Sequence, residues 1–558
     1  MSYVHNLLDQ YHFSILKDMV QLLDIPPASN KKKGHVDVLA QALFTPEIVQ
    51  RGLSLLGQRE RQALATIQRT EGRIQARRLR LQLLRQGTIL PVDDKTRRHS
   101  TAAHNIFAPT ERRTSFQAII GRLMAVGLVC GDGIVTTSYS NRTKIQYDNV
   151  NTLYIHETVH PLLPAPPPLD SHEFQVKDLT KIDKGSARSF QRDLYFYWST
   201  VRTTSLSLTK QDRLYKKDLR LVNSALLYPQ EIGYKDEPDL PRLIFLRLLL
   251  IDMELLTCQE HKVRAAEHPR FLGRKPADRI QRTFVHWRDG MFWNEILSIP
   301  RITVAAAGTR ITPAPEPIAR SRKRVLKHIA ELHKKLAQPE PSAQRPADEA
   351  QEGTWVPISQ LIDHIRLVDY DFLLPRDFSP SNSSYYYAYY GYTSRRSPYI
   401  SYGNEMGWSF SPPFQDEAEG WEIVEAEFIR SILLEPLYWM GLLDIGYTKD
   451  KPTAYRLTSV GEWVLGMGSE LDIPEGEGKV VVQPNFEIFA LDPISDLTLS
   501  KLDEFADRLS AERAIKYQLT RESVYRAQRN HWTAQQIIDD LQKMSVTPMP
   551  QNVTRTIQ

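Results

Sequence analysis

The chain has 558 residues, of which 41% are hydrophobic and 25% are charged, a composition typical of a globular protein with several domains. Its two cysteines, Cys130 and Cys258, exclude a disulfide framework and favour a reducing compartment. The sequence shows neither a basic-then-apolar leader nor a run of about eighteen apolar residues, which predicts a soluble, cytoplasmic protein.

The net charge is only +5, but the charge is unevenly distributed along the chain. Residues 57–122 hold 14 Lys and Arg against 5 Asp and Glu, whereas residues 403–487 hold 5 against 16. A basic half beside an acidic half indicates nucleic acid as one partner and a basic protein surface, or self-contact, as the other. Two ordinary solvated faces would give the same pattern.

Residues 1–50 are predicted to form a helical hairpin, with a Pro/Ser turn over 25–30 and a Leu-rich helix after Lys31–Lys33. This order resembles the SAP motif, a small DNA-binding hairpin. A plain helical hairpin with solvated lysines fits the pattern as well.

Residues 51–160 have the layout of a winged helix, with helices over 58–68, 74–84 and 115–129, then wing strands over 134–137 and 153–155. In such folds the third helix usually lies in the major groove. Arginines of the last two helices are therefore candidate phosphate contacts. They are Arg73, Arg77, Arg78, Arg80, Arg112, Arg113 and Arg122. The alternative is a solvated helix whose arginine stems cover apolar surface.

The segment His156–His160 matches the HExxH pattern of zinc hydrolases. That chemistry requires a helix, so that both histidines share one face. Here a strand-like segment precedes His156, and Pro161 disfavours helical dihedrals at His160. The pattern thus predicts a chance match in the wing, and zinc hydrolysis is the remote alternative.

Residues 161–175 are predicted to be a Pro-rich linker, and residues 337–353 a polar one. Between them, residues 176–336 form a helical, winged-helix-like module with a second group of basic residues. These candidate nucleic-acid contacts are Lys210, Arg213, Lys216, Lys217 and Arg220.

Residues 354–470 are predicted to form a third winged-helix-like module, with helices over 358–367 and 426–443 and a strand pair over 442–457. An insertion over 379–413 holds eight tyrosines between Tyr385 and Tyr402. Tyr with Gly and Ser builds no ordinary core. The tyrosines could stack on unpaired bases or serve self-association, and the sequence does not decide between these roles.

The C-terminal residues 479–558 predict a small α+β domain. Val480–Val482 and the apolar positions after Pro484 suit a strand pair, and Thr520 precedes a helix. Thr533 and Gln536 form a capping box for a last long helix.

This segment resembles the N-terminal domain of XPB-type helicases, which is also found in bacterial helicase-associated proteins. The resemblance rests on the Val-rich strand closing on Gln483-Pro484-x-Phe486, the run Tyr517–Tyr525 and the tail Pro550–Val553. The phrase Thr209–Arg220 is similar to one in the same bacterial proteins. In XPB helicases a motor follows the domain, but no GxxxxGK[ST] loop occurs in this sequence.

Together these patterns predict a mainly α fold with small β wings (α+β), made of tandem winged-helix-like modules and the C-terminal domain. The function expected is a non-catalytic, nucleoid-associated protein of bacterial type that binds DNA beside a separate helicase motor or repair enzyme, with no cofactor or metal. A second hypothesis is a protein–protein scaffold or transcriptional regulator that uses winged helices as docking surfaces.

Overall fold

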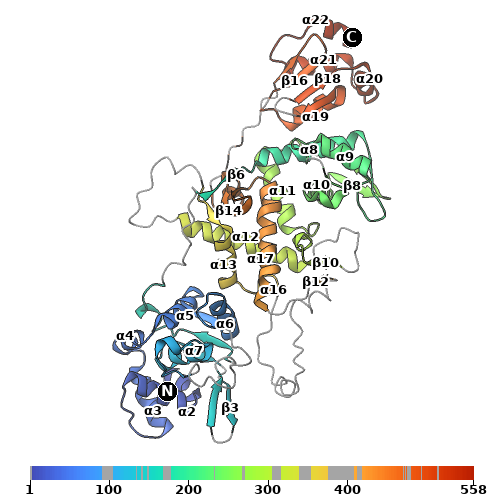
Figure 1. Ribbon diagram of the computed structural model, residues 1–558. Coiled ribbons are helices and arrows are strands. Elements are labelled where there is room, and N and C mark those ends of the chain that lie inside the picture. Colours follow the sequence, from blue (N-terminus) through green and yellow to red (C-terminus); the bar gives the residue numbers. More distant parts are fainter. Residues whose placement is uncertain are drawn as a thin grey trace. The chain divides into compact units, whose positions relative to one another are not determined.

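The computed structural model describes residues 3–90, 105–132, 135–139, 142–146, 150–166, 178–230, 233–266, 270–304, 316–337, 353–374, 408–410 and 417–558, the last range with short gaps at 469–470, 472, 474–478, 492 and 512–514. The chain divides into two units. Unit 1 comprises residues 1–174, 363–401 and 415–420, and unit 2 comprises 175–362, 402–414 and 421–558. Most regular elements are helices, and the strands form small antiparallel sheets (Figure 1), which confirms the predicted fold class.

Unit 1 begins with six helices: α1 (Tyr3–Gln10), α2 (Phe13–Leu23), α3 (Lys32–Ala42), α4 (Pro46–Ser54), α5 (Gln58–Arg69) and α6 (Ala76–Arg85). Helix α7 (Phe116–Ala125) follows. A three-stranded sheet has the order β1 (Arg73–Gln75), β5 (Thr152–Tyr154), β2 (Cys130–Asp132), and β3 (Val135–Tyr139) pairs with β4 (Arg142–Gln146) as a separate hairpin. The three predicted helices are present with bounds that differ by a few residues, but β1 lies where the second helix was predicted to begin. The strands predicted over 134–137 and 153–155 do not pair with each other: β3 pairs with β4, and β5 with β1 and β2.

One continuous hydrophobic core runs through unit 1 from Leu7 to Val159. Helix α2 packs on α7, and Tyr11 accepts a hydrogen bond from the backbone of Gly131 at 3.2 Å. The predicted boundary between residues 50 and 51 is therefore not a break in the core.

The first part of unit 2 repeats that order of elements. It consists of α8 (Ala187–Thr203), β7 (Leu206–Ser207), α9 (Lys216–Ala225), α10 (Pro241–Asp252), then the hairpin β8 (Leu256–Gln259) and β9 (Lys262–Ala265). The sheet order is β7-β9-β8. Helix α11 (Pro276–Asp289) packs against both α8 and α10.

The middle of unit 2 holds α12 (Glu316–Ala337), which packs on α11, and a four-stranded sheet. The sheet order is β11 (Val356–Pro357), β14 (Lys451–Leu457), β13 (Leu443–Thr448), β6 (Lys181–Asp183). Two further strands, β10 (Ile302–Val304) and β12 (Trp408–Phe410), form a separate pair.

The helices beside this sheet are α17 (Glu425–Ile432), which continues as a π-turn over Leu433–Leu437, and the short α18 (Ser459–Val464). Helices α13 (Ile358–Val368) and α16 (Glu417–Ile423) span the division between the units. The helix and hairpin predicted over 358–367 and 442–457 are both confirmed. Of the Tyr-rich insertion only β12 is described, and most of both predicted linkers also lies outside the described residues.

The C-terminal domain has a four-stranded sheet in the order β15 (Val480–Val482), β16 (Glu487–Ala490), β18 (Ile515–Gln518), β17 (Asp507–Ala511). Its helices are α19 (Asp496–Phe505), α20 (Arg521–Arg529), α21 (Ala534–Met544) and α22 (Gln551–Ile557). Thr520 and Thr533 cap α20 and α21 through capping boxes, as the sequence predicts for Thr533.

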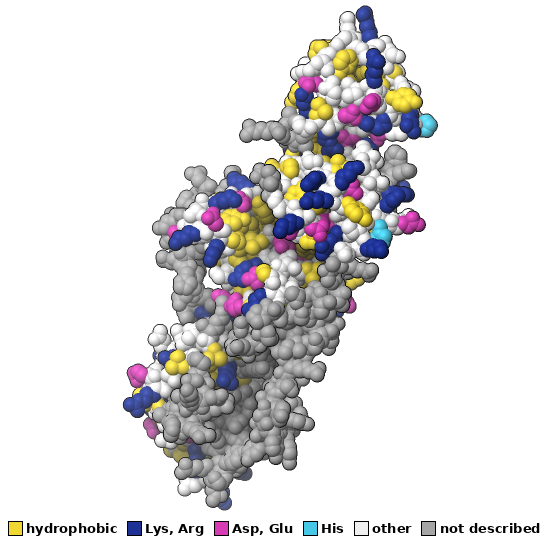
Figure 2. Space-filling model, turned by 45° about the vertical axis from the view of Figure 1, so that its right-hand side comes forward, with side chains coloured by type: hydrophobic (Ala, Val, Ile, Leu, Met, Phe, Trp, Pro, Cys, Tyr) yellow, Lys and Arg dark blue, Asp and Glu magenta, His cyan; other side chains and the backbone are white. Residues whose placement is uncertain are grey.

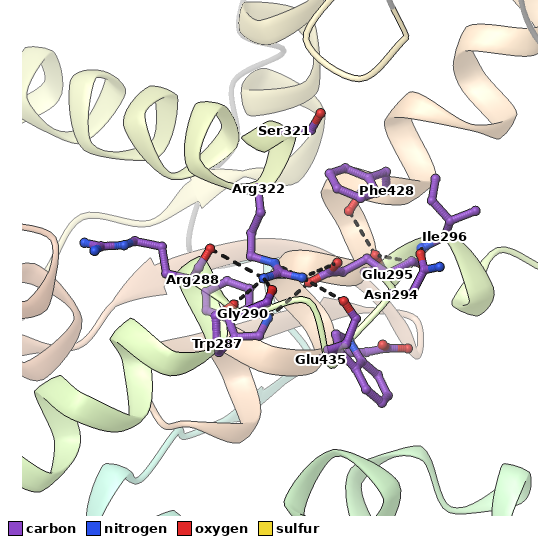
Figure 3. A network of polar contacts seen from close by, with 12 residues as sticks. Trp287, Arg288, Gly290, Asn294, Glu295, Ile296, Ser321, Arg322, Phe428 and Glu435 are labelled. Carbon is purple, nitrogen blue, oxygen red and sulfur yellow. Dashed lines mark hydrogen bonds and ion pairs between the residues drawn. The ribbon is translucent and has the colours of Figure 1, made fainter. Parts of the chain in front are cut away.

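A buried arginine holds the middle of unit 2 together (Figure 3). Arg322 and Glu295 are both fully buried and lie 2.7 Å apart, Nε to Oε1. The guanidinium also donates to the carbonyl oxygens of Trp287, Gly290 and Trp293. Trp287 in turn donates from Nε1 to Glu295 Oε1 at 3.1 Å. All donors of the guanidinium thus find acceptors, and α12 is joined to the end of α11 and the loop that follows it.

We expect Arg322→Ala to lower the free energy of unfolding by about 3–5 kcal/mol, because it leaves Glu295 as an unpaired buried charge. Arg320→Ala is the matched control on the same helix. Its partner is Glu316, both side chains are about two-thirds exposed or more, and the loss should stay below about 1 kcal/mol. Urea unfolding followed by tryptophan fluorescence measures both, and similar losses in the two variants would contradict the structural role of Arg322.

A second prediction concerns Glu435, which accepts a hydrogen bond from Ser298 at 2.8 Å beside this network. Burial raises the pKa of Glu435 to about 7, the Ser298 hydrogen bond opposes the rise, and the Glu295 carboxylate adds to it. The folded protein therefore holds more protons than the unfolded chain between about pH 4.5 and 7, and its free energy of unfolding should fall as the pH rises through that window.

Glu435→Gln should remove this contribution, so that the variant gains stability relative to the parent as the pH rises. Urea unfolding of both proteins at several pH values between about 5 and 8 tests it. A difference between the two that does not change with pH would show that Glu435 is not the titrating group.

Candidate nucleic-acid interface

The described arginines of β1 and α6 are engaged within unit 1. Arg73 is exposed but pairs with Asp132 at 3.2 Å and lies over the ring of Tyr154. Arg78 donates to the carbonyl oxygen of Leu367. Arg80 is half-buried and also has an interaction partner, and the side chain of Arg77 lies outside the described residues. The described side chains of this helix do not form the continuous free basic face that the sequence suggested.

Two of the three arginines predicted at the third helix are structural. Arg113 is buried and its Nε lies 2.5 Å from Glu60 Oε1. Arg122 is buried and donates to the carbonyl oxygens of Leu55 and Ile106, at 3.2 and 3.4 Å. Helix α7 has no exposed residue at all. The expected insertion of this helix into a major groove therefore does not fit the structure, and of the three arginines only Arg112 is exposed.

The second predicted group lies differently. Lys210, Lys216, Lys217 and Arg220 are exposed, while Arg213 pairs with Asp236 at 2.6 Å. The last three exposed residues share one face of α9, because residues three and four apart are neighbours on a helix. The opposite face of α9 is anchored in the core by Leu219 and Val222.

Strand β9 extends this surface with two basic residues that sequence reasoning missed. Lys262 and Arg264 are exposed on either side of the buried Val263. Lys262 pairs across the sheet with Ser207, whose carbonyl accepts from the backbone of Tyr215, the residue before α9. The alternation of basic and apolar residues in Lys262-Val263-Arg264-Ala265 could have indicated an amphipathic strand with an outward basic face.

We call these six residues the α9–β9 basic surface: Lys210, Lys216, Lys217, Arg220, Lys262 and Arg264. Within the part of the chain that the structure describes, none of the six forms an ion pair with a carboxylate. Figure 2 shows Lys and Arg side chains gathered over one face of unit 2. A hollow of about 560 Å³ opens beside Lys216 and Arg220 and is also lined by Asn223 and Tyr234.

Lys216 and Lys217 occupy the first turn of α9. The partial positive charge of a helix N-terminus favours anions there, so two lysines lower the stability of the helix. The same arrangement attracts a phosphate, which would meet both ammonium groups and the free backbone N–H groups of the first turn. Asp218 in the same turn offsets part of this charge, but its carboxylate is engaged by the backbone N–H of Ser207 at 2.8 Å, so the turn keeps a net positive charge for an external anion.

The third helix of this module, α10, cannot read a groove either. None of its residues is exposed, and Arg247 is buried against Glu237 with Nε–Oε1 at 3.0 Å. Its Phe245 packs against the rings of Trp293 and Trp439.

The HExxH match lies in a turn and a short 3₁₀ segment after β5, as predicted, and not on a helix. His156 is buried, stacks on Phe44 at 4.4 Å between ring centroids, and has a hydrogen bond between Nδ1 and Thr158 Oγ1. Burial lowers its pKa. His160 is exposed. The segment lacks the helical face that a zinc hydrolase needs.

Two buried clusters of polar side chains join helix α8 to the C-terminal domain. In the first, Asp496 at the start of α19 pairs with Arg192 Nε at 2.8 Å and Arg279 Nη1 at 2.5 Å. Arg192 also donates to the carbonyl oxygen of Ile494 at 2.6 Å.

In the second cluster, Asp503 accepts hydrogen bonds from the hydroxyls of Tyr195 and Ser199. Arg508 of β17 donates to Ser199 Oγ at 2.9 Å and lies over the ring of Phe196. Burial raises the pKa of Tyr195, and the Asp503 carboxylate raises it further, so the phenol remains a hydrogen-bond donor. The basic module and the C-terminal domain are thus packed together within unit 2.

The comparison with known families identifies one part of the chain. Residues 480–558 match the family described as the helicase conserved C-terminal domain. No curated protein matches the chain. The chain therefore carries a helicase-associated C-terminal region, joined by α8 to the α9–β9 basic surface. Among the described helices, none is long and apolar enough to cross a membrane.

Asp503→Ala should destabilise the packing between α8 and the C-terminal domain by about 3–5 kcal/mol, because Arg508 loses its buried carboxylate and two hydroxyls lose their acceptor. The neighbouring Glu504→Ala is the control. Its ion pair with Arg202 at 2.6 Å is about a quarter exposed, and its loss should cost at most about 1 kcal/mol. Chemical unfolding measures the loss of stability in both variants. Equal losses would refute the importance of the Asp503 cluster.

Proposed function

We propose that this protein is a non-catalytic DNA-binding accessory protein that acts beside a helicase or repair enzyme. The observation that carries the proposal is the exposed α9–β9 basic surface with two lysines in the first turn of a helix. Its six cations can neutralise backbone phosphates, which gives affinity without sequence specificity.

The helicase-associated region supports a role beside a motor, because it is packed on the same helix, α8, that supports α9. The resemblance of residues 479–558 to the N-terminal domain of XPB-type helicases points the same way. In this proposal the motor is a separate protein, and the chain itself supplies DNA contacts and positions the C-terminal domain.

A scaffold or regulatory role is the second candidate, and one observation favours it. Neither α7 nor α10 has an exposed residue, so both helices serve packing and present no side chain to the bases of a DNA groove. A protein partner of acidic surface could then occupy the α9–β9 basic surface in place of DNA.

The test is fluorescence anisotropy with labelled single- and double-stranded DNA across a salt series. We expect log Kd to rise linearly with log salt concentration. The triple variant Lys216→Glu, Lys217→Glu, Arg220→Glu should bind duplex far more weakly, and its salt slope should be smaller by about 2–3, because each phosphate contact contributes about 0.9.

The matched control reverses three lysines of α12, namely Lys327, Lys334 and Lys335, which changes the net charge equally in the same unit. It should keep most of the parent's slope. If both triple variants lose binding alike, the affinity follows net charge and not this surface. If the parent binds neither form of DNA at low salt, the scaffold role is favoured instead.

A further inference from the structure

A cavity of about 310 Å³ lies in unit 2 where α8 and α11 meet the start of α19. Among the described residues that line it, Arg192 and Arg279 contribute two guanidinium groups that share one carboxylate, that of Asp496. It is separate from the α9–β9 basic surface, because none of that surface's six residues lines it.

Two of these arginines are deeply buried while sharing a single negative partner. Arg192 and Arg279 are 7% and 5% exposed, and both pair with Asp496, which is 3% exposed. Among the described residues, one positive charge is therefore left without a compensating carboxylate, on a side chain that is more than nine-tenths buried. Such a charge is costly unless an anion pairs with it.

Polar atoms of the lining are also left without partners. The Nε of Arg279 and the Oε1 of Gln191 are buried and have no hydrogen-bond partner among the described atoms. Gln191 is 6% exposed, and its Nε2 donates to Thr283 Oγ1 at 3.0 Å. Because that hydroxyl itself donates to the carbonyl of Arg279, the orientation of the Gln191 amide is determined and its Oε1 needs a donor.

Three long helices begin at this cavity. Ser186 and Ala187 start α8, Pro276 starts α11, and Ser495 and Asp496 start α19. Each contributes the partial positive charge of its N-terminus. The surplus guanidinium charge and the unpaired Nε–H of Arg279 require an anion, and the unpaired Oε1 of Gln191 requires a donor. A suitable ligand is therefore an anion that still carries one O–H group.

We propose that this cavity binds a phosphate-class oxyanion, either inorganic phosphate or the phosphate of a small monoester. A hydrogen phosphate supplies negative oxygens for Arg192 and Arg279 and an O–H donor for Gln191, whereas sulfate supplies only the former. Since the arginines belong to α8 and α11 and Asp496 to α19, the bound anion strengthens the attachment of the C-terminal domain to α8.

The experiment is thermal unfolding of the full chain, followed by tryptophan fluorescence, with phosphate, sulfate or chloride at one ionic strength. Isothermal titration calorimetry then measures stoichiometry and affinity. We expect the unfolding midpoint to rise with phosphate concentration, with one phosphate per chain, and to rise less with sulfate. Glycerol phosphate as a second probe distinguishes free phosphate from a monoester by the tighter of the two affinities.

Two variants of different character keep the test independent of folding. Gln191→Glu places a carboxylate beside the arginines, so it should unfold no earlier than the parent without phosphate and should lose the response to phosphate. Arg279→Gln removes the unmatched charge and should weaken phosphate binding at least about tenfold, the loss of one charge-assisted hydrogen bond. Arg282→Gln, on the exposed side of α11, is the control and should respond as the parent does.

An equal response of the parent to phosphate, sulfate and chloride would overturn the proposal. So would an undiminished response in both Gln191→Glu and Arg279→Gln. The triple variant of the α9–β9 basic surface should keep its response to phosphate, so failure of this site and failure of DNA binding can be told apart.

Discussion

The guanidinium of Arg322 is the interaction on which the middle of unit 2 depends. It lies among backbone carbonyls that no helix or sheet satisfies, at the end of α11 and in the loop after it, and Glu295 supplies the balancing charge. Without it, the three carbonyl groups would lose this donor and the Glu295 carboxylate would be a buried charge without its cation, left with the hydrogen bond from Trp287. The path of residues 287–295 therefore depends on one side chain.

Buried arginine–carboxylate pairs of this kind recur through the molecule. Arg113 with Glu60, Arg247 with Glu237, and Arg456 with Asp444 are all pairs in which both side chains are at most 8% exposed. Arginine suits such places because its planar group satisfies several acceptors at once. A segment rich in arginine in this protein therefore indicates buried ion pairs as often as it indicates a phosphate-binding surface. The distinction between the two proposed binding sites rests on this difference: the α9–β9 basic surface has free cations, whereas the cavity at Asp496 has one buried cation too many.

Local patterns predicted the fold well where the cause is local. The capping residue Thr533 and the inward stripe of α21 needed only a window of eleven residues, and Pro161 was enough to exclude a helix at His160. The basic surfaces were predicted less well. Arg113 finds its carboxylate 53 positions away and Arg78 its carbonyl 289 positions away, so no window reveals that they are engaged. Lys262 and Arg264 were missed for the opposite reason, since two basic residues in a short strand form no conspicuous cluster.

The contacts of helix α8 with both α9 and the C-terminal domain determine how a force would pass between them. One face of this 17-residue helix contacts α9, and another is bonded to α19 and β17 through Asp496, Asp503 and Arg508. If the protein acts beside a motor, a force applied to the C-terminal domain would therefore reach α9 through α8, because both are packed on the sides of this one helix.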